Sequence, residues 1–344
     1  MTVNDLNRII VFKTGAIGDV LMSTPFLRAL RKRFPNAQID YWIGRWAKDV
    51  LEGNENINNL LTFGQNIFFK KNIFGLISLL LKIKKQRYDM AFVLDKLWVI
   101  NYFINLSGIP KRVGFDRNGE GWPNTINVKY GPVKHEIDYY LELAYKVGAS
   151  NEKDKSLEVN LSKGDRRFAV NFILKNSLSR KKIIGLAPAG GGNPGQKGSF
   201  KRFPKEKYIN LIYALIKKGF RIIFFGSKSD VKYNDYIKSR IQDSILDITG
   251  KTTIKHSIAL MKYLNYFICN DSGPMHMASA AGCRVISIFG PTDPRRLAPL
   301  NKGSVYIWKP TKYDPCYDIY GRRHNTAHDC MSNLSENDIL RLIR

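Results

Sequence analysis

The chain has 344 residues, of which 44% are hydrophobic and 24% charged, a composition that excludes disordered, collagen-like and low-complexity proteins. This length predicts two domains of roughly 100–200 residues each. The 55 Lys and Arg residues outnumber the 29 Asp and Glu residues, and the net charge is +26. Such an excess predicts an anionic partner, such as nucleic acid, a membrane surface or a phosphorylated small molecule. A generally basic surface is the alternative.

The sequence predicts neither a secretion signal nor a membrane-spanning helix. The N-terminal MTVNDLNRIIVFK has no basic segment followed by an apolar one, so no signal peptide is expected. The longest apolar run, Ile73–Leu81, is far shorter than the ~20 residues that a spanning helix needs. We therefore expect a cytoplasmic protein.

In the first half of the chain, short apolar runs alternate with amphipathic stretches. Strands are predicted at Ile9–Phe12, Ile39–Ile43 and Met90–Leu94, and helices at Asp19–Phe34, Ile73–Lys85 and Lys134–Val147. The following stretch, Gly148–Lys163, is polar and has no clear hydrophobic period, which is typical of a linker. A domain boundary is therefore expected within this stretch, and we assign the first domain to residues 1–155.

The second half repeats the alternation. Strands are predicted at Ile183–Ala187, Arg221–Phe225, Tyr266–Asn270 and Arg284–Phe289, and helices at Lys205–Lys218, Asp230–Ile241, Ile254–Leu264 and Met275–Ala281. We assign this second domain to residues 156–330. The whole pattern predicts an α/β protein with parallel sheets covered on both faces, as two Rossmann-like domains facing a cleft. Ligands of such sheets bind at the carboxyl ends of the strands, so the turns there are the candidate sites.

The turn after the first strand is Lys13-Thr14-Gly15-Ala16-Ile17-Gly18-Asp19. Gly15 and Gly18 let the backbone turn sharply and let another molecule approach closely. Their spacing fits neither G-x-G-x-x-G nor G-x-x-x-x-G-K-[ST], which disfavours a dinucleotide site and a P-loop. Asp19 is then either a first-turn acid that the helix dipole stabilises or a general base that takes a proton from an acceptor hydroxyl.

The turn after the first predicted strand of the second half has features of an anion site. Residues 187–204 include the glycines Gly191 and Gly192 and the cations Lys197 and Lys201. Such a loop can present backbone N–H groups to a phosphate, although a mobile surface loop is the alternative. Pro204 is expected to start the next helix.

The turn Asn270-Asp271-Ser272-Gly273-Pro274-Met275-His276 joins a predicted strand to a predicted helix. Free N–H groups and the helix dipole predict a diphosphate site at Ser272 and Gly273, with His276 as a further donor. Asp271 is expected to orient the loop by accepting backbone N–H bonds. An ordinary capped helix is the alternative.

Two weaker signals lie in the same half. Asp230 follows the strand Arg221–Phe225 and could bind ribose or sugar hydroxyls, and Thr252 precedes the next helix and could contact a nucleotide. Helix capping explains each of them equally well.

Taken together, these turns resemble glycosyltransferase family 9, the group that includes the ADP-heptose:lipopolysaccharide heptosyltransferases. The segment K-T-G-A-I-G-D-V-L-M-S-T-P-F-L-R-A-L-R-K-R-F-P is similar to the opening motif of that family, and N-D-S-G-P-M-H-M-A-S-A-A-G-C to its D-[ST]-G-x-x-H motif. The late pattern at Cys330–Ile339 is also similar, and we expect a C-terminal helix over residues 331–344. The resemblance runs from about Arg8 to this helix.

The resemblance implies a GT-B fold and inverting, metal-independent transfer from a nucleotide sugar to a lipopolysaccharide-core or other glycolipid acceptor. Asp19 aligns with the family's proposed base and Lys201 with its leaving-phosphate lysine, while Asp230 falls near an acid that is usually Glu. The residues that match the donor turn are Asp271, Ser272, Gly273 and His276. The donor site is expected also to include Gly18, and the donor itself to be ADP-heptose or a similar compound, with no cofactor and no metal.

Two rival functions stay open. One is a nucleotide-sugar epimerase with the same fold, which would need no acceptor. The other is a basic nucleic-acid-binding protein, but no RNP, zinc-finger or helix-turn-helix signature occurs, so no nucleic-acid partner is expected.

The stretch Ile73–Leu81 is flanked by basic residues, among them Lys82, Lys84 and Lys85. We expect this side of the protein to meet an anionic membrane or phosphorylated glycolipid, which would place the protein peripherally at the inner face of the cytoplasmic membrane. A core helix with basic ends is the alternative.

Four cysteines occur without any C-x-x-C pair, so common zinc and thioredoxin spacings are absent. Cys269 lies in an apolar run and is expected to be a buried thiol. Cys316 and Cys330 could be free thiols, a disulfide, or metal ligands together with His324 and His328.

Overall fold

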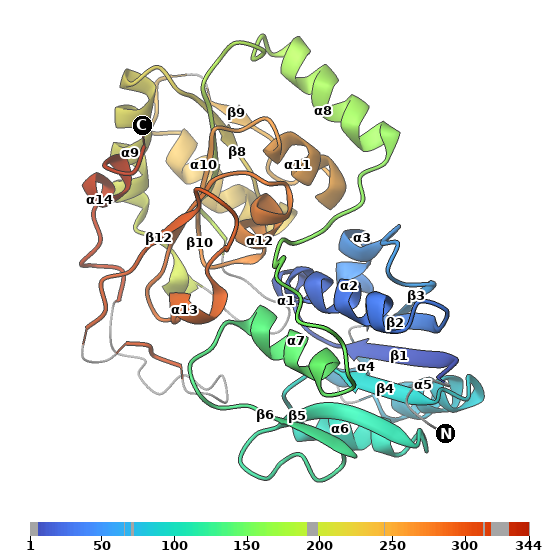
Figure 1. Cartoon of the computed structure of the whole chain (residues 1–344). Coiled ribbons are helices and arrows are strands. Elements are labelled where there is room, and N and C mark those ends of the chain that lie inside the picture. Colours follow the sequence, from blue (N-terminus) through green and yellow to red (C-terminus); the bar gives the residue numbers. More distant parts are fainter. Residues whose placement is uncertain are drawn as a thin grey trace. The chain divides into compact units, whose positions relative to one another are not determined.

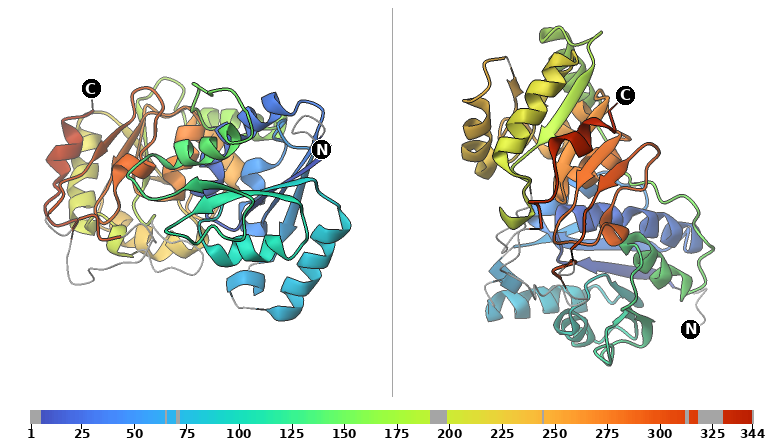
Figure 2. Two further views of the ribbon diagram at one scale, coloured as in Figure 1. Left: turned by 60° about the horizontal axis from the view of Figure 1, so that its bottom comes forward. Right: turned by 90° about the vertical axis from the view of Figure 1, so that its left-hand side faces the viewer.

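The computed structural model describes residues 6–64, 66–69, 72–190, 199–243, 245–311, 314–317 and 330–343. The chain divides into two compact units, Met1–Asn160 and Leu161–Arg344, and the division lies inside the polar stretch Gly148–Lys163. Each unit is one twisted parallel sheet with helices on both faces (Figures 1 and 2).

The sheet of the first unit has the strand order β3-β2-β1-β4-β5-β6, and all of its pairs are parallel. Its strands are β1 (Arg8–Lys13), β2 (Gln38–Gly44), β3 (Asn59–Phe63), β4 (Met90–Val93), β5 (Lys111–Asp116) and β6 (Ile126–Lys129). Its helices are α1 (Ile17–Met22), α2 (Thr24–Arg33), α3 (Lys48–Leu51), α4 (Asn66–Phe69), α5 (Ile73–Lys85), α6 (Trp98–Asn105) and α7 (Glu136–Tyr145). Aromatic rings fill one face of the sheet, where Phe12 stacks on Phe63 with centroids 5.3 Å apart.

The sheet of the second unit has the order β12-β11-β10-β7-β8-β9 and is also parallel. Its strands are β7 (Ile183–Ala187), β8 (Arg221–Phe224), β9 (Leu246–Asp247), β10 (Tyr266–Asn270), β11 (Val285–Ile288) and β12 (Val305–Ile307). Its helices are α8 (Lys163–Lys175), α9 (Lys205–Lys217), α10 (Val231–Lys238), α11 (Ile254–Met261), α12 (Gly273–Ala280), α13 (Pro294–Leu297) and α14 (Glu336–Leu340). Short 3₁₀ turns occur at η2 (Arg45–Ala47), η3 (Ser199–Lys201) and η4 (Lys228–Asp230).

The expected helix over Asp19–Phe34 is wrong, because the segment forms two helices that meet at Ser23. Pro25 has no N–H to donate to the carbonyl four residues earlier, that of Leu21. The Thr24 hydroxyl donates to this carbonyl instead, at 2.8 Å. The expected C-terminal helix is also shorter than residues 331–344, since α14 begins only after Ser335, which forms a capping box with Asp338.

Candidate functional site

In the first unit, ionisable side chains gather where β1 and β4 end. Lys13 is the last residue of β1, and its buried ammonium donates to the carbonyl of Leu94 at 3.2 Å and lies 3.4 Å from Asp95 Oδ1. Thr14 donates its backbone N–H and its hydroxyl to the same carboxylate, at 2.7 and 2.8 Å. Burial lowers the pKa of Lys13, but Asp95 and Asp19 raise it above its ordinary value overall. Lys13 is therefore a fixed positive charge.

Asp19 lies half-buried in the first turn of α1, beside this lysine. A Cβ atom added to Gly15 would come within 2.8 Å of Lys13 Cε and 2.9 Å of Asp19 Oδ2. Neither Gly15 nor Gly18 has a positive φ, so the turn itself does not require glycine. The missing side chain at Gly15 instead leaves room for Lys13 and Asp19 to approach the same point.

A second lysine, Lys96, lies three residues after the end of β4. Lys96 Nζ lies 2.7 Å from Glu136 Oε2, in the first turn of α7, and Tyr130 donates to the other oxygen of that carboxylate at 2.7 Å. Burial lowers the pKa of Lys96, but Glu136 raises it above its ordinary value overall. The hydroxyl of Tyr140 is buried without a hydrogen-bond partner among the described residues, and burial raises its pKa well above the usual range.

Four residues of this cluster lie outside the sequence motifs, namely Asp95, Lys96, Glu136 and Tyr140. The sequence does indicate Asp95 and Lys96, because they follow a predicted strand at the edge where ligands bind in parallel sheets. Glu136 and Tyr140 reach the cluster from α7, which only tertiary packing determines.

In the second unit, Lys201 and Asp271 form an ion pair at the carboxyl edge of the sheet. Lys201 Nζ lies 2.7 Å from Asp271 Oδ2, and the Thr292 hydroxyl donates to the same oxygen at 2.8 Å. Burial alone would raise the pKa of Asp271, but Lys201 and Thr292 hold it below its ordinary value. Among the described residues, side chains bind Asp271, and the expectation that it accepts backbone N–H bonds stays a prediction. Thr292, which follows β11, was also missed.

Asn270, the last residue of β10, fixes the segments that carry this pair. Its buried amide oxygen accepts from the N–H of Phe203 at 2.9 Å, and its NH₂ donates to the carbonyl of Pro188 at 2.9 Å. These two hydrogen bonds join the turns after β7 and β10. Lys201 lies two residues before Phe203, whose backbone N–H makes one of the two bonds.

The start of α12 lies directly beside the ion pair. Ser272 is its N-cap residue but donates its hydroxyl to the Asn270 carbonyl at 3.1 Å and makes no side-chain cap bond. Gly273 is the first residue of the helix, and His276 is buried one turn in, close enough to lower the pKa of Asp271. The structure thus brings together Lys201, Asp271, Ser272, Gly273 and His276, as the sequence motif predicts.

Asp230 and Thr252 lie in two neighbouring turns farther along the same edge. The N–H of Gly250 donates to the carbonyl of Gly226 at 2.9 Å. Asp230 accepts from the Ser227 N–H and hydroxyl at 2.8 and 2.7 Å in a capping box, while the Thr252 hydroxyl lies 2.7 Å from that of Ser257. Both side chains therefore have local structural partners. Gly191, Gly192 and Lys197 lie outside the described residues.

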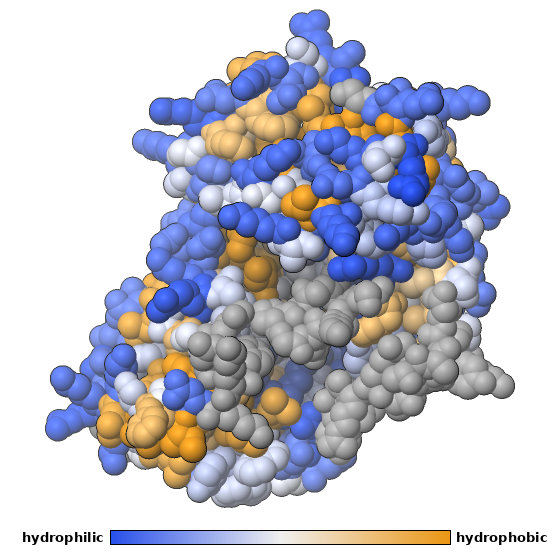
Figure 3. All heavy atoms as spheres, turned by 180° about the vertical axis from the view of Figure 1, so that it is seen from behind, coloured by the Kyte–Doolittle hydropathy of each residue, from blue (hydrophilic) through white to orange (hydrophobic). Residues whose placement is uncertain are grey.

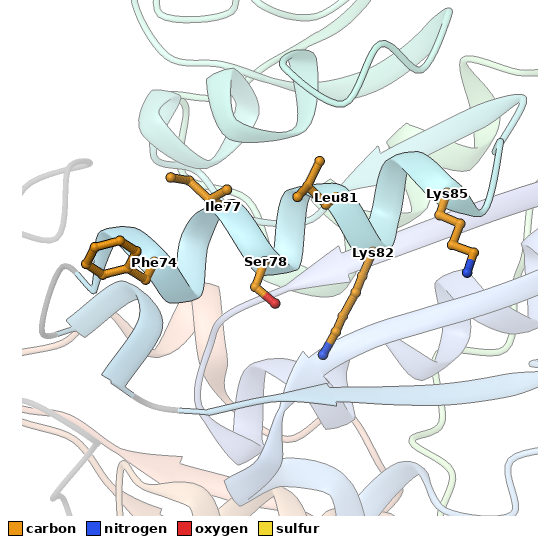
Figure 4. A pocket seen from close by; sticks show the side chains of 6 residues that line it. All are labelled: Phe74, Ile77, Ser78, Leu81, Lys82 and Lys85. Atoms are coloured by element: carbon orange, nitrogen blue, oxygen red, sulfur yellow. The ribbon is translucent and has the colours of Figure 1, made fainter.

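The basic residues proposed to meet an acceptor or membrane lie on α5. Only one face of this helix is packed, through Leu79 and Ile83, while Phe74, Ile77 and Leu81 are exposed. The alternative, a core helix with basic ends, therefore holds for the packed face but not for the exposed one. A shallow pocket lies along the helix (Figure 4), lined by Phe74, Ile77, Ser78, Leu81, Lys82 and Lys85.

Lys82, Lys84 and Lys85 are all exposed, and within the described part of the chain none of them forms an ion pair. The space-filling view in Figure 3 shows hydrophobic side chains exposed between hydrophilic ones. No helix among the described residues is both long and apolar enough to cross a membrane.

Comparison with known proteins identifies the family. The model of glycosyltransferase family 9 (heptosyltransferase) matches residues 76–325. The chain belongs to glycosyltransferase family 9. It is therefore a glycosyltransferase, as its turn motifs predict.

Curated relatives of this glycosyltransferase match most of its length. Lipopolysaccharide heptosyltransferase 2 of Escherichia coli (strain K12) is 27% identical over 315 residues, which cover 86% of each chain. Lipooligosaccharide heptosyltransferase 2 of Haemophilus influenzae is 25% identical over 311 residues, covering 87% of this chain and 88% of the relative.

Solved structures share its fold. A family 9 glycosyl transferase from Veillonella parvula has a TM-score of 0.82 at 23% identity and covers 99% of this chain and 97% of its own. The E. coli ADP-heptose lipopolysaccharide heptosyltransferase II has a TM-score of 0.76 at 22% identity, with 97% of both chains covered. The family-9 glycosyltransferase described here therefore has the predicted GT-B fold.

Proposed function

We propose that this glycosyltransferase transfers a heptose from ADP-heptose to a lipopolysaccharide-core acceptor, with inversion at the anomeric carbon and without a catalytic metal ion. The names of the curated relatives support the sugar and the acceptor class. The observation that carries the proposal is the ion pair between Lys201 and Asp271 at the start of α12.

The second unit is proposed to bind the donor. A diphosphate at the start of α12 would meet the helix dipole and the backbone N–H of Gly273, together with Lys201 and His276. The turns that contain Asp230 and Thr252 lie along the same strand edge and are assigned to the nucleoside and sugar hydroxyls. A role of Gly18, Gly191 and Gly192 in donor binding stays a prediction from the sequence.

Asp19 is proposed as the general base. It takes the proton of the acceptor hydroxyl while the oxygen attacks the anomeric carbon and the bond from this carbon to the diphosphate oxygen breaks. Because the nucleophile enters opposite the leaving group, the configuration inverts. Lys201 and the N-terminus of α12 stabilise the negative charge that develops on the diphosphate, which is the role that a metal ion has in other transferases.

The test is ADP release and product NMR with ADP-heptose and a heptose-deficient lipopolysaccharide core, with and without EDTA. Asp19→Asn is expected to lower kcat by about 10²–10⁴-fold. Asp49→Asn is the matched control, because Asp49 also lies half-buried in the first turn of a helix, α3. An inverted product that is insensitive to EDTA supports the proposal. Equal activity of both variants would exclude Asp19 as the base, and turnover without acceptor would favour an epimerase.

We further propose that the acceptor is reached at the inner face of the cytoplasmic membrane. The exposed apolar side chains of α5 lie beside three exposed lysines, a combination suited to an anionic lipid surface. A second exposed group follows Lys96, where the rings of Trp98, Tyr102 and Trp122 have centroids 5.4–6.4 Å apart. Such rings can stack against the sugars of a glycolipid. The net charge of +26 fits a phosphorylated acceptor, and no nucleic-acid partner is proposed.

A further inference from the structure

A cluster of metal-ligating side chains lies outside the proposed catalytic groups of the second unit. Asp314, Cys316 and Cys330 each offer one ligand atom, and these atoms all lie within 4.8 Å of one another. Cys316 and Cys330 are buried, and no disulfide joins any of the four cysteines. Sequence proximity does not explain the convergence, since Cys330 is fourteen residues beyond Cys316.

From this geometry we infer that Asp314, Cys316 and Cys330 bind a transition-metal ion of the zinc class. In a tetrahedral zinc site, bonds of ~2.3 Å to sulfur and ~2.1 Å to oxygen place these two ligands about 3.6 Å apart. Cys316 donates its thiol hydrogen to Asp314 Oδ1, and the 3.4 Å between these two atoms is close to that separation, so a metal ion could replace the hydrogen with little movement. Two thiolates with one carboxylate suit Zn²⁺ better than Mg²⁺ or Ca²⁺, which prefer oxygen ligands only. The fourth position of the tetrahedron is left to a further ligand, and His324 and His328, considered above, lie outside the described residues.

The carboxylate is oriented by a second residue, as ligands of metal sites usually are. Thr311 donates its N–H and its hydroxyl to Asp314 Oδ2, at 2.9 and 3.0 Å. The other oxygen, Oδ1, is therefore directed to Cys316. A disulfide between Cys316 and Cys330 would have no need of this arrangement, so the metal explains more of the structure.

The cluster also supports the loop that carries Thr292. The N–H of Cys316 donates to the carbonyl of Pro291 at 2.9 Å. A Cβ added to Gly290 would lie 3.1 Å from Cys330 Sγ, so Cys330 packs directly on this loop. A metal bound here would fix residues 290–292, and through Thr292 the Asp271 carboxylate.

The test measures metal rather than glycosyl transfer, so its failure is distinguishable from failure of the proposed function. The full chain, purified after expression with zinc in the medium, is expected to contain one equivalent of metal by plasma mass spectrometry. The double variant Cys316→Ser/Cys330→Ser is expected to lose it. Cys283→Ser, which changes a buried thiol elsewhere, is expected to keep it. Metal loss should lower the Tm of the wild type and of Cys283→Ser, and added zinc should restore it.

Two further measurements do not depend on the folding of the double variant. Cobalt added to the metal-free wild type should give intense thiolate-to-metal absorption and the visible bands of tetrahedral Co²⁺. Thr311→Val leaves all three ligands in place and should weaken zinc binding by about tenfold or more in competition with a chromophoric chelator, because it loosens Asp314. A wild-type protein with only trace metal and no cobalt bands would overturn the proposal, and so would a Cys316–Cys330 disulfide found by mass spectrometry in the protein as purified.

Discussion

Replacing Lys201 by Met separates the structural role of this lysine from its proposed role in binding phosphate. The substitution leaves Asp271 with a side chain only 7% exposed and without its ion-pair partner, while the lysine that it replaces is itself only 14% exposed. At 2.7 Å, two unit charges attract by about 6 kcal/mol at an effective dielectric constant of ~20. The cost of desolvating both groups offsets part of this attraction. Breaking such a pair from one side typically costs about 3–5 kcal/mol, because an uncompensated charge stays buried.

The companion variant Asp271→Asn removes the charge but can still accept a hydrogen bond from Thr292. We expect it to lose about 1–3 kcal/mol, less than Lys201→Met. The double variant should then be more stable than the sum of the single losses predicts, by about 0.5–3 kcal/mol. Urea unfolding of the four proteins, followed by fluorescence, measures this cycle. Strict additivity would refute the ion pair.

Calorimetry with ADP completes the experiment. Lys201→Met should lose most of its affinity for ADP, whereas Asp271→Asn should keep it or bind more tightly, since it removes a negative charge beside the diphosphate. For the wild type, ADP at about 100 times its Kd should add about 2.7 kcal/mol to the free energy of unfolding. Wild-type ADP affinity in Lys201→Met would refute the proposed role of this lysine.

Three other predictions rest on separate observations. The pKa of Asp271 is lower in the folded protein than in the unfolded chain. The stability that its carboxylate contributes is therefore complete above the unfolded pKa of ~3.9 and is lost as the pH falls through the folded value. Acid unfolding of the wild type should include this loss of stability, whereas acid unfolding of Asp271→Asn should not. Gly15→Ala places a Cβ 2.8 Å from Lys13 Cε and 2.9 Å from Asp19 Oδ2, and steady-state assays should find kcat at least about tenfold lower, whereas unchanged kcat would contradict the proposed place of the reaction. Charge reversal to Glu at Lys82, Lys84 and Lys85 should abolish sedimentation with anionic liposomes. The same reversal at the exposed Lys217, Lys218 and Lys262 changes the net charge equally and should leave binding intact; equal loss in both would indicate a non-specific effect of charge.

The buried strands could be predicted from sequence because their apolar runs have no other explanation. Ile9–Phe12 and Tyr266–Asn270 lie inside β1 and β10, each with neighbours on both sides. Strands without such an apolar run could not be predicted. β5 pairs with both β4 and β6, but it reads Lys-Arg-Val-Gly-Phe-Asp, and its charged ends hide the apolar centre. β9 has only two residues and is defined by its neighbour β8 rather than by its own sequence.

The candidate site could be located from the sequence, but the ion pair between Lys201 and Asp271 could not be predicted. Lys201 and Asp271 are 70 residues apart, and nothing local indicates that one binds the other. Both nevertheless follow strands whose carboxyl ends share one sheet edge. If residues that follow the carboxyl end of every strand are considered, Asp95, Lys96 and Thr292 are also candidates, although they lie outside the sequence motifs.

The same arrangement occurs in each unit at the carboxyl ends of the strands, and it accounts for an acid beside the proposed phosphate site. In each, a lysine is held by a buried carboxylate at the end of a neighbouring strand, Lys13 by Asp95 and Lys201 by Asp271. Burial alone would lower the pKa of Lys13, but Asp95 and Asp19 raise it above its ordinary value overall. In both units the ion pair limits the positions that the ammonium group can occupy. An acid at the proposed diphosphate site is therefore compatible with anion binding, because the carboxylate of Asp271 is engaged by Lys201 and Thr292.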